Sequence, residues 1–250
     1  MLRSVIETLS KGIVLKRKLP PEFGSRTLYV SPEGGGLRYW RTGLRDVDPM
    51  LLQVVKSCIK PGYTVWDVGG NVGLFAFAAA VRAEGGQVAV FEPDIWLCHL
   101  LQKSAGLNAD LNIDIFPLAV SNTDGFATFH IARRSRSANF LAQAEGSSQT
   151  GGVRKSLRVP TITLDTFLTH YKKPDFIKID TEGAEHLVFE GMKEILAAAR
   201  PVILCEVSGE NRSFISETLK KNRYKIYDAD KLPELEEVDA PNYNALAIPE

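Results

Sequence analysis

The 250-residue chain carries no net charge, because its 30 Lys and Arg residues balance its 30 Asp and Glu residues. Proteins that bind nucleic acids usually have a basic surplus, since neutralisation of phosphates supplies much of their affinity. The missing surplus argues against a nucleic-acid substrate, although a local basic patch would still fit the charge balance. A small molecule or a glycan is the expected partner.

Cysteines are few and scattered. The chain has three of them, Cys58, Cys98 and Cys205, and they form neither a CxxC pair nor a spacing typical of zinc sites. Each lies in an apolar stretch, so we expect buried free thiols rather than disulfides. Free thiols fit a reducing compartment and favour a cytoplasmic location.

Long hydrophobic runs are also absent. No apolar segment reaches the roughly 18 residues that a membrane span requires. The basic start of the chain lacks a continuous apolar segment followed by a small-residue cleavage site, so no secretory signal is predicted. The oligomeric state has no signature in the sequence.

Residues 1–60 are predicted to form an N-terminal cap on the main domain. The expected elements are a helix over 2–16, a hairpin of 26–30 and 37–41 around a Pro-Glu-Gly-Gly-Gly turn, and a helix that begins at Asp48-Pro49. Pro61-Gly62 ends this last helix and marks the domain boundary.

Residues 61–250 alternate between short apolar runs and longer amphipathic segments, which is typical of an α/β domain. Strands are predicted at 64–68, 87–91, 113–120, 176–179 and 202–207, with a closing pair at 224–227 and 243–248. Helices are predicted at 73–82, 94–107, 184–199 and 212–222. Strands that are apolar on both sides indicate a mostly parallel sheet with helices on both faces. The polar stretch 133–155 has no clear period and is predicted to be an inserted loop.

A glycine-rich turn, Asp67-Val-Gly-Gly-Asn-Val-Gly73, joins the first main strand to the first main helix. Gly69, Gly70 and Gly73 let the backbone turn tightly and approach a ligand, and Asn71 tolerates a left-handed conformation. The GxGxxG pattern of a dinucleotide site is absent. Asp67 would repel a pyrophosphate but suits a cofactor that carries an ammonium and a sulfonium. The turn therefore favours S-adenosylmethionine over NAD.

Glu92 ends the next strand, in Val-Phe-Glu-Pro. A carboxylate at that place can accept hydrogen bonds from both hydroxyls of a ribose. The adenine is expected beside the residues that follow the third strand, where Ala119 and Val120 lie. Together with the glycine turn, these residues predict a nucleoside-binding edge of the sheet.

The chain resembles the FkbM family of class I methyltransferases over about residues 60–208. The motifs that carry the resemblance are Asp67–Gly73, Phe91-Glu-Pro93, Asn108, Thr163-Leu-Asp165, the block Phe176-Ile-Lys-Ile-Asp-Thr-Glu-Gly-Ala-Glu185, and Gly191. Gly70 stands where the family usually has alanine. The resemblance implies a Rossmann-like α/β fold with a mostly parallel seven-stranded sheet and an antiparallel final strand, and O-methyl transfer as the usual activity.

Three residues of the Phe176–Glu185 block are candidates for catalysis. Asp180 should end a parallel strand beside the cofactor, where a carboxylate could take the proton of an acceptor hydroxyl. Lys178 lies on the same side of that strand and is costly to bury alone, so we expect it to pair with a carboxylate such as Asp180 or Glu206. Glu182 follows in the turn and is the third candidate.

A metal offers a second route to the same deprotonation. Asp180, Glu182 and Glu206 are oxygen ligands at the ends of neighbouring strands, a set that suits Mg²⁺ or Mn²⁺. A bound cation would lower the pKa of the hydroxyl instead of removing its proton directly. The sequence leaves the metal-free and metal-assisted mechanisms open.

The function predicted from these features is S-adenosylmethionine-dependent O-methylation of a sugar, a glycan or a natural product. The alternatives are an N-methyltransferase, a nucleic-acid methyltransferase and a non-catalytic binding module. Base-directed enzymes often carry an Asn/Asp-Pro-Pro-aromatic element at the fourth strand, where this chain has Asp180-Thr-Glu-Gly.

Overall fold

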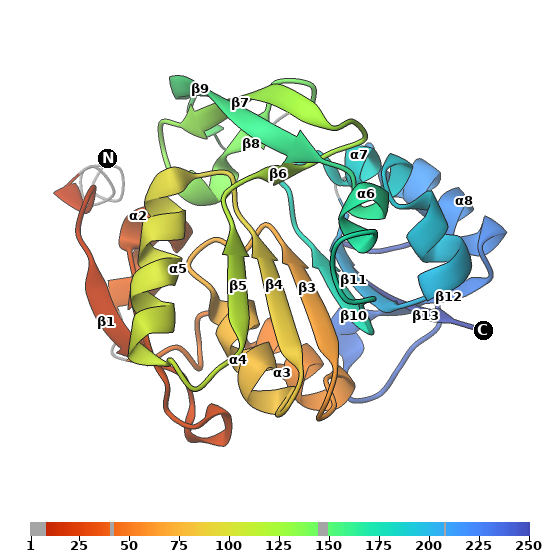
Figure 1. The fold of residues 1–250 in the computed structure, drawn as a ribbon, viewed down its shortest axis with the longest axis horizontal. Helices are drawn as coiled ribbons and strands as arrows, with labels where there is room; N and C mark the ends of the chain where they lie inside the picture. Colours follow the sequence, from red (N-terminus) through yellow and green to blue (C-terminus); the bar gives the residue numbers. More distant parts are fainter. Residues whose placement is uncertain (1–8, 41–42, 145–149, 208) are drawn as a thin grey trace.

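The computed structural model describes residues 9–40, 43–144, 150–207 and 209–250. Its centre is a seven-stranded sheet in the order β12-β13-β11-β10-β3-β4-β5 (Figure 1). The strands are β3 (Thr64–Val68), β4 (Gln87–Phe91), β5 (Ile113–Phe116), β10 (Phe176–Ile179), β11 (Val202–Glu206), β12 (Tyr224–Asp228) and β13 (Asn244–Pro249).

Strands β5, β4, β3, β10 and β11 run parallel, whereas β13 is antiparallel to both of its neighbours. The mostly parallel sheet with an antiparallel final strand is therefore confirmed. One predicted strand is divided: the run 113–120 ends in the main sheet at Phe116, and Ala119–Val120 becomes β6 of a second sheet.

Helices cover both faces of the main sheet, as the apolar strands require. One face packs against α3 (Pro49–Cys58), α4 (Leu74–Arg82) and α5 (Ile95–Leu107). The other face packs against α6 (Leu164–Leu168), α7 (Glu185–Glu190), the π-helical turn Ile195–Ala199 and α8 (Arg212–Lys221). The single helix predicted over 184–199 is thus two pieces. Among the described residues, no helix combines the length and hydrophobicity that a membrane span needs.

The N-terminal segment differs from its prediction. β1 (Leu15–Lys18) pairs antiparallel with β2 (Thr27–Val30), so the hairpin of 26–30 and 37–41 is wrong. The residues predicted as the hairpin turn instead form a short helix, α2 (Pro32–Gly35). Ser31 caps the N-terminus of this helix, and Pro32 occupies a first-turn position where a backbone N–H would have no partner within the helix. A 3-10 turn, η2 (Leu37–Trp40), follows α2.

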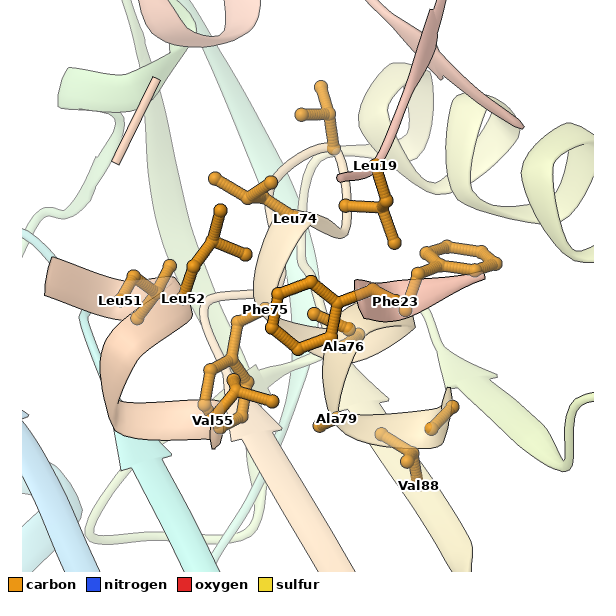
Figure 2. Close-up of a cluster of buried hydrophobic side chains, with 14 of the residues drawn as sticks. Leu19, Phe23, Leu51, Leu52, Val55, Leu74, Phe75, Ala76, Ala79 and Val88 are labelled. Atoms are coloured by element: carbon orange, nitrogen blue, oxygen red, sulfur yellow. The ribbon is translucent and has the colours of Figure 1, made fainter. Parts of the chain in front are cut away.

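Of the predicted helix over 2–16, residues 2–8 lie outside the described residues, and the prediction is wrong at its end, where residues 15–16 belong to β1. The helix that begins after Asp48 is confirmed as α3, with the Asp48 carboxylate accepting the Leu51 N–H as its N-cap. Figure 2 shows Leu19 and Phe23 beside α4, in one hydrophobic cluster with side chains of α3 on the other side of that helix. This contact fixes the N-terminal segment to the main domain.

Residues 119–162 form a second, four-stranded sheet in the order β6-β9-β7-β8. Its long strands are β7 (Gly125–Ala132) and β9 (Val153–Ile162), which pair antiparallel, and β8 (Phe140–Leu141) adds a short edge. The predicted loop 133–155 is therefore wrong in part, since Phe140–Leu141 form β8 and Val153–Lys155 belong to β9. This sheet stands over the carboxyl ends of β3, β4 and β5 (Figure 1).

Phe167 is the centre of an aromatic cluster on the α6 face of the main sheet. Its ring meets Trp66, Phe91 and Phe116 edge-on and stacks on Tyr171 at 4.8 Å between ring centroids.

We expect Phe167→Ala to lower the free energy of unfolding by about 3–5 kcal/mol, through lost burial and an unfilled cavity. Urea denaturation followed by circular dichroism would measure the change. The matched control is Phe126→Ala, because Phe126 is 71% exposed and its loss should cost less than about 0.5 kcal/mol. Equal costs for the two variants would contradict this account of the core.

Candidate active site

The glycine turn lies at the carboxyl end of β3 and leads into α4. Gly69 and Gly73 have positive φ angles, 85° and 89°, and Asn71 also lies in the left-handed region. A Cβ on Gly69 would come within 1.8 Å of the Asp180 carbonyl oxygen, and one on Gly70 within 2.2 Å of Val90. Gly69 and Gly70 are therefore required by close contacts within the protein, Gly69 with the residue after β10 and Gly70 with β4.

A cavity of about 280 Å³ opens at this edge of the sheet. Its walls come from the glycine turn, the ends of β4, β10 and β11, the second sheet, and the N-terminal segment. Six of the predicted cofactor residues line it: Gly69, Gly70, Asn71, Glu92, Ala119 and Val120.

Glu92 is buried in the cavity wall and joins two turns. Its two carboxylate oxygens accept the backbone N–H groups of Asn71 and Asp94, each at 2.8 Å. Burial raises the pKa of Glu92 to about 8. Each oxygen keeps a second lone pair, so the carboxyl group can still accept hydrogen bonds from a ligand in the cavity.

Lys178 is the buried cation at the centre of the site. Its ammonium lies 3.2 Å from Asp67 Oδ1, 3.1 Å from the Gly69 carbonyl oxygen and 3.2 Å from Asp180 Oδ2. Three acceptors match the three N–H donors of a lysine. The predicted pairing with Asp180 is confirmed, and the pairing with Asp67 was missed. The two carboxylates raise the pKa of Lys178 above its ordinary value, against the effect of burial.

Asp67 is fully buried and does not line the cavity. It sits beside Lys178 because the parallel register of β3 and β10 pairs these two residues. Burial raises the pKa of its carboxyl group, and the charge of Lys178 opposes that rise. Asp67 and Gly73, both predicted at the cofactor, thus support the walls of the cavity from behind.

Asp180, Glu182 and Glu206 converge where β10 and β11 end. One carboxylate oxygen from each lies within 4.8 Å of the others. Burial and the neighbouring carboxylates raise the pKa of Glu182 to about 9 and that of Glu206 to about 7. The Tyr243 hydroxyl donates a hydrogen bond to Glu206 and stands at the mouth of the cavity. The convergence expected from the sequence is present.

Sequence reasoning missed a set of polar residues that encloses the cavity. Arg136, from the second sheet, pairs with Glu33 of α2 at 3.0 Å and with Asp94 of α5 at 2.5 Å. Asn139 donates to the same Asp94 carboxylate at 2.9 Å. In the sequence, the only sign of this role is the basic character of residues 133–155. That character does not indicate which carboxylates the arginine side chains would pair with.

The polar atoms of the cavity fit an adenosine-like cofactor with an amino-acid tail. The Asn71 Oδ1 atom is buried and has no hydrogen-bond partner in the part of the chain that the structure describes. Such an atom costs free energy unless a ligand or water supplies a donor. Glu92 offers acceptors for ribose hydroxyls, and the apolar side chains of Ala119 and Val120 line the cavity, where a base could pack.

The model of the methyltransferase FkbM domain matches residues 67–238. Among solved structures, the chain is similar to methyltransferase FkbM from Methylobacillus flagellatus KT, with 16% identity and a TM-score of 0.49 over 74% of this chain and 43% of that one. It is also similar to precorrin-6y C5,15-methyltransferase from Geobacter metallireducens GS-15, with 11% identity and a TM-score of 0.48 over 80% and 87%. No curated protein gives a match.

The family match begins at Asp67, where the glycine turn starts, and extends beyond Glu206 of the carboxylate cluster. The match therefore contains both the glycine turn and the carboxylate cluster, which form the part of the cavity wall that comes from the main sheet. It covers more than half of the chain. The chain belongs to the FkbM family of S-adenosylmethionine-dependent methyltransferases and has their Rossmann-like class I fold.

Proposed function

We propose that this protein methylates a hydroxyl oxygen and that Asp180 is the general base. The observation that carries the proposal is the position of the Asp180 carboxylate. It lies at the carboxyl end of β10, faces the cavity with 33% of its side chain exposed, and is held by Lys178 at 3.2 Å. A base in this place is both fixed and reachable by an acceptor.

The cofactor residues of this proposal are Gly69, Gly70, Asn71, Glu92, Ala119 and Val120, which line the cavity. When bound, S-adenosylmethionine supplies an electrophilic methyl group, which passes to the acceptor oxygen as its bond to sulfur breaks. The protein's part is to orient the acceptor, exclude water and take the hydroxyl proton on a carboxylate oxygen of Asp180. Lys178 serves as a positioning residue that holds Asp180 against the turn.

A polyhydroxylated acceptor, such as a sugar in a glycan or a natural product, fits the groups around Asp180. Glu182 and Glu206 offer carboxyl groups for neighbouring hydroxyls, and Tyr243 adds an aromatic ring at the entrance. Methylation of a nitrogen requires less proton removal, and methylation of a nucleic acid calls for more positive charge around the acceptor. The carboxylate-rich end of the cavity favours neither of these reactions.

The three cysteines are free thiols, which supports a cytoplasmic location.

A metal-assisted version of the same reaction is the second candidate. The three carboxylates within 4.8 Å of one another could hold Mg²⁺ or Mn²⁺, which would lower the pKa of the acceptor hydroxyl. The reaction class is unchanged, and only the source of hydroxyl activation differs.

The cofactor assignment predicts that S-adenosylhomocysteine stabilises the folded protein. At a ligand concentration 100 times the Kd, linkage adds about 2.7 kcal/mol, which should raise the melting temperature by a few degrees. Differential scanning fluorimetry would measure the shift, with NAD as the control that should give none. An unchanged melting temperature at millimolar S-adenosylhomocysteine would remove the cofactor assignment for this cavity.

The base assignment predicts that Asp180→Asn reduces methyl transfer at least 100-fold while cofactor affinity stays within about threefold, because an amide keeps the shape but cannot accept the proton. Isothermal titration calorimetry with S-adenosylhomocysteine and transfer of a radiolabelled methyl group to a panel of glycans would report the two properties. Full activity in the variant would exclude Asp180 as the base. Transfer by the wild type itself distinguishes an enzyme from a binding module.

The metal-assisted mechanism predicts that Mg²⁺ or Mn²⁺ raises the melting temperature of the wild type and that EDTA abolishes methyl transfer. The Glu206→Gln variant, which removes one of the three carboxylates, should lose the metal-induced shift. The mechanism that we propose uses Asp180 without a metal, so we expect EDTA to leave methyl transfer unchanged. Loss of activity in EDTA, with recovery on adding either cation, would overturn the metal-free mechanism.

A further inference from the structure

The charges on the cavity wall are unevenly matched. Within the described ranges, five carboxylates line it: Asp48, Glu92, Asp180, Glu182 and Glu206. Of the cations that line it, Lys178 gives its three donors to Asp67, Gly69 and Asp180, and Arg136 is paired with two carboxylates of its own. Neither has a free charge for a ligand.

Among the residues that the structure describes, Arg38 is the third cation that lines the cavity, and it is exposed. Its guanidinium donates to the Val47 carbonyl oxygen, and no carboxylate pairs with it among the residues that the structure describes. A guanidinium has five N–H donors in a fixed fork that matches a carboxylate. Arg38 therefore keeps donors and an uncompensated charge at the edge of the cavity.

Tyr39 is the next residue and points inward. Only 5% of it is exposed, it lines the cavity, and its hydroxyl has no hydrogen-bond partner in the described ranges. The ring lies directly on Gly35, where a Cβ would come within 2.1 Å of it. Burial raises the pKa of Tyr39, so the phenol stays protonated and can donate a hydrogen bond.

The backbone that carries both side chains is held in place. The Arg17 guanidinium donates to the Tyr39 and Trp40 carbonyl oxygens, each at 3.0 Å. Tyr39 and Gly69 of the glycine turn line the same cavity. Arg38 and Tyr39 thus lie on the cavity wall, on a backbone that Arg17 holds in place, and both side chains keep unused donors.

We propose that Arg38 and Tyr39 bind the carboxylate at the amino-acid end of S-adenosylmethionine. The inference rests on the proposed function. The carboxylates on the main-sheet side of the cavity suit the ammonium and sulfonium of the cofactor but repel its carboxylate, so that group needs donors from elsewhere. The N-terminal segment supplies them from outside residues 67–238, the part that matches the family.

The test compares two ligands that differ only in this carboxylate: S-adenosylhomocysteine and its decarboxylated analogue, 5'-(3-aminopropylthio)-5'-deoxyadenosine. Calorimetry should show that the wild type binds S-adenosylhomocysteine at least tenfold more tightly. Arg38→Gln should weaken binding of S-adenosylhomocysteine about tenfold, and Tyr39→Phe about three- to tenfold, as expected for charge-assisted hydrogen bonds. Neither variant should change the affinity for the analogue by more than about twofold.

Two control variants come from the same segment. Arg45→Gln removes an exposed arginine that pairs with Glu22, and Tyr29→Phe removes a phenol outside the cavity, so both should bind like the wild type. If Arg38→Gln and Tyr39→Phe weaken both ligands equally, or weaken neither, the inference is overturned while the cofactor assignment stands. A wild type that binds neither ligand overturns the proposed function and this inference with it.

Discussion

The buried ammonium of Lys178 is the interaction on which the site depends. A lysine inside a parallel strand loses its hydration, and that cost is acceptable only where acceptors surround it. Asp67 on β3, the Gly69 carbonyl in the following turn, and Asp180 at the end of β10 supply those acceptors. One charge therefore joins two strands and the glycine turn, and it holds the proposed base at the same time.

The glycine turn depends on the same contact. Gly69 approaches the Asp180 carbonyl so closely that no side chain fits between them. The glycines of such a turn are usually explained by the close approach of a ligand. In this protein, Gly69 is already required by the close approach of the neighbouring strand. The loop that is proposed to receive the cofactor and the strand that carries the proposed base are thus one rigid unit.

Two smaller pieces complete the site from opposite sides. The second sheet brings Arg136, and the N-terminal segment brings Glu33 together with the Arg38–Tyr39 pair. The Glu33, Arg136 and Asp94 ion pairs are almost fully buried, so removing one partner would leave an unpaired charge in a low-dielectric setting. This network ties the N-terminal segment and the second sheet to α5, and it gives the cavity walls that the main sheet alone does not provide.

Local signals predicted the main sheet well. The strands 64–68, 87–91 and 176–179 have the predicted bounds, because each is a short, mostly apolar run with charged or glycine residues after it. The same signals misled at Pro32–Gly35, where a cap and a proline start a helix and the glycines suggested a hairpin. They also failed between 133 and 155, where exposed strand residues are polar on most positions and show little alternation.

The sequence by itself determined the order of strands and helices, the glycine turn and the Lys178–Glu185 block, since these follow from hydrophobic period and from short motifs. Only the tertiary structure decided which carboxylate neutralises Lys178, which residues face the cavity, and how the N-terminal segment joins it. Asp67 and Lys178 are far apart in the chain and meet through the register of β3 and β10. Pairings over such distances are set by how the sheet assembles, and no local pattern of residues encodes them.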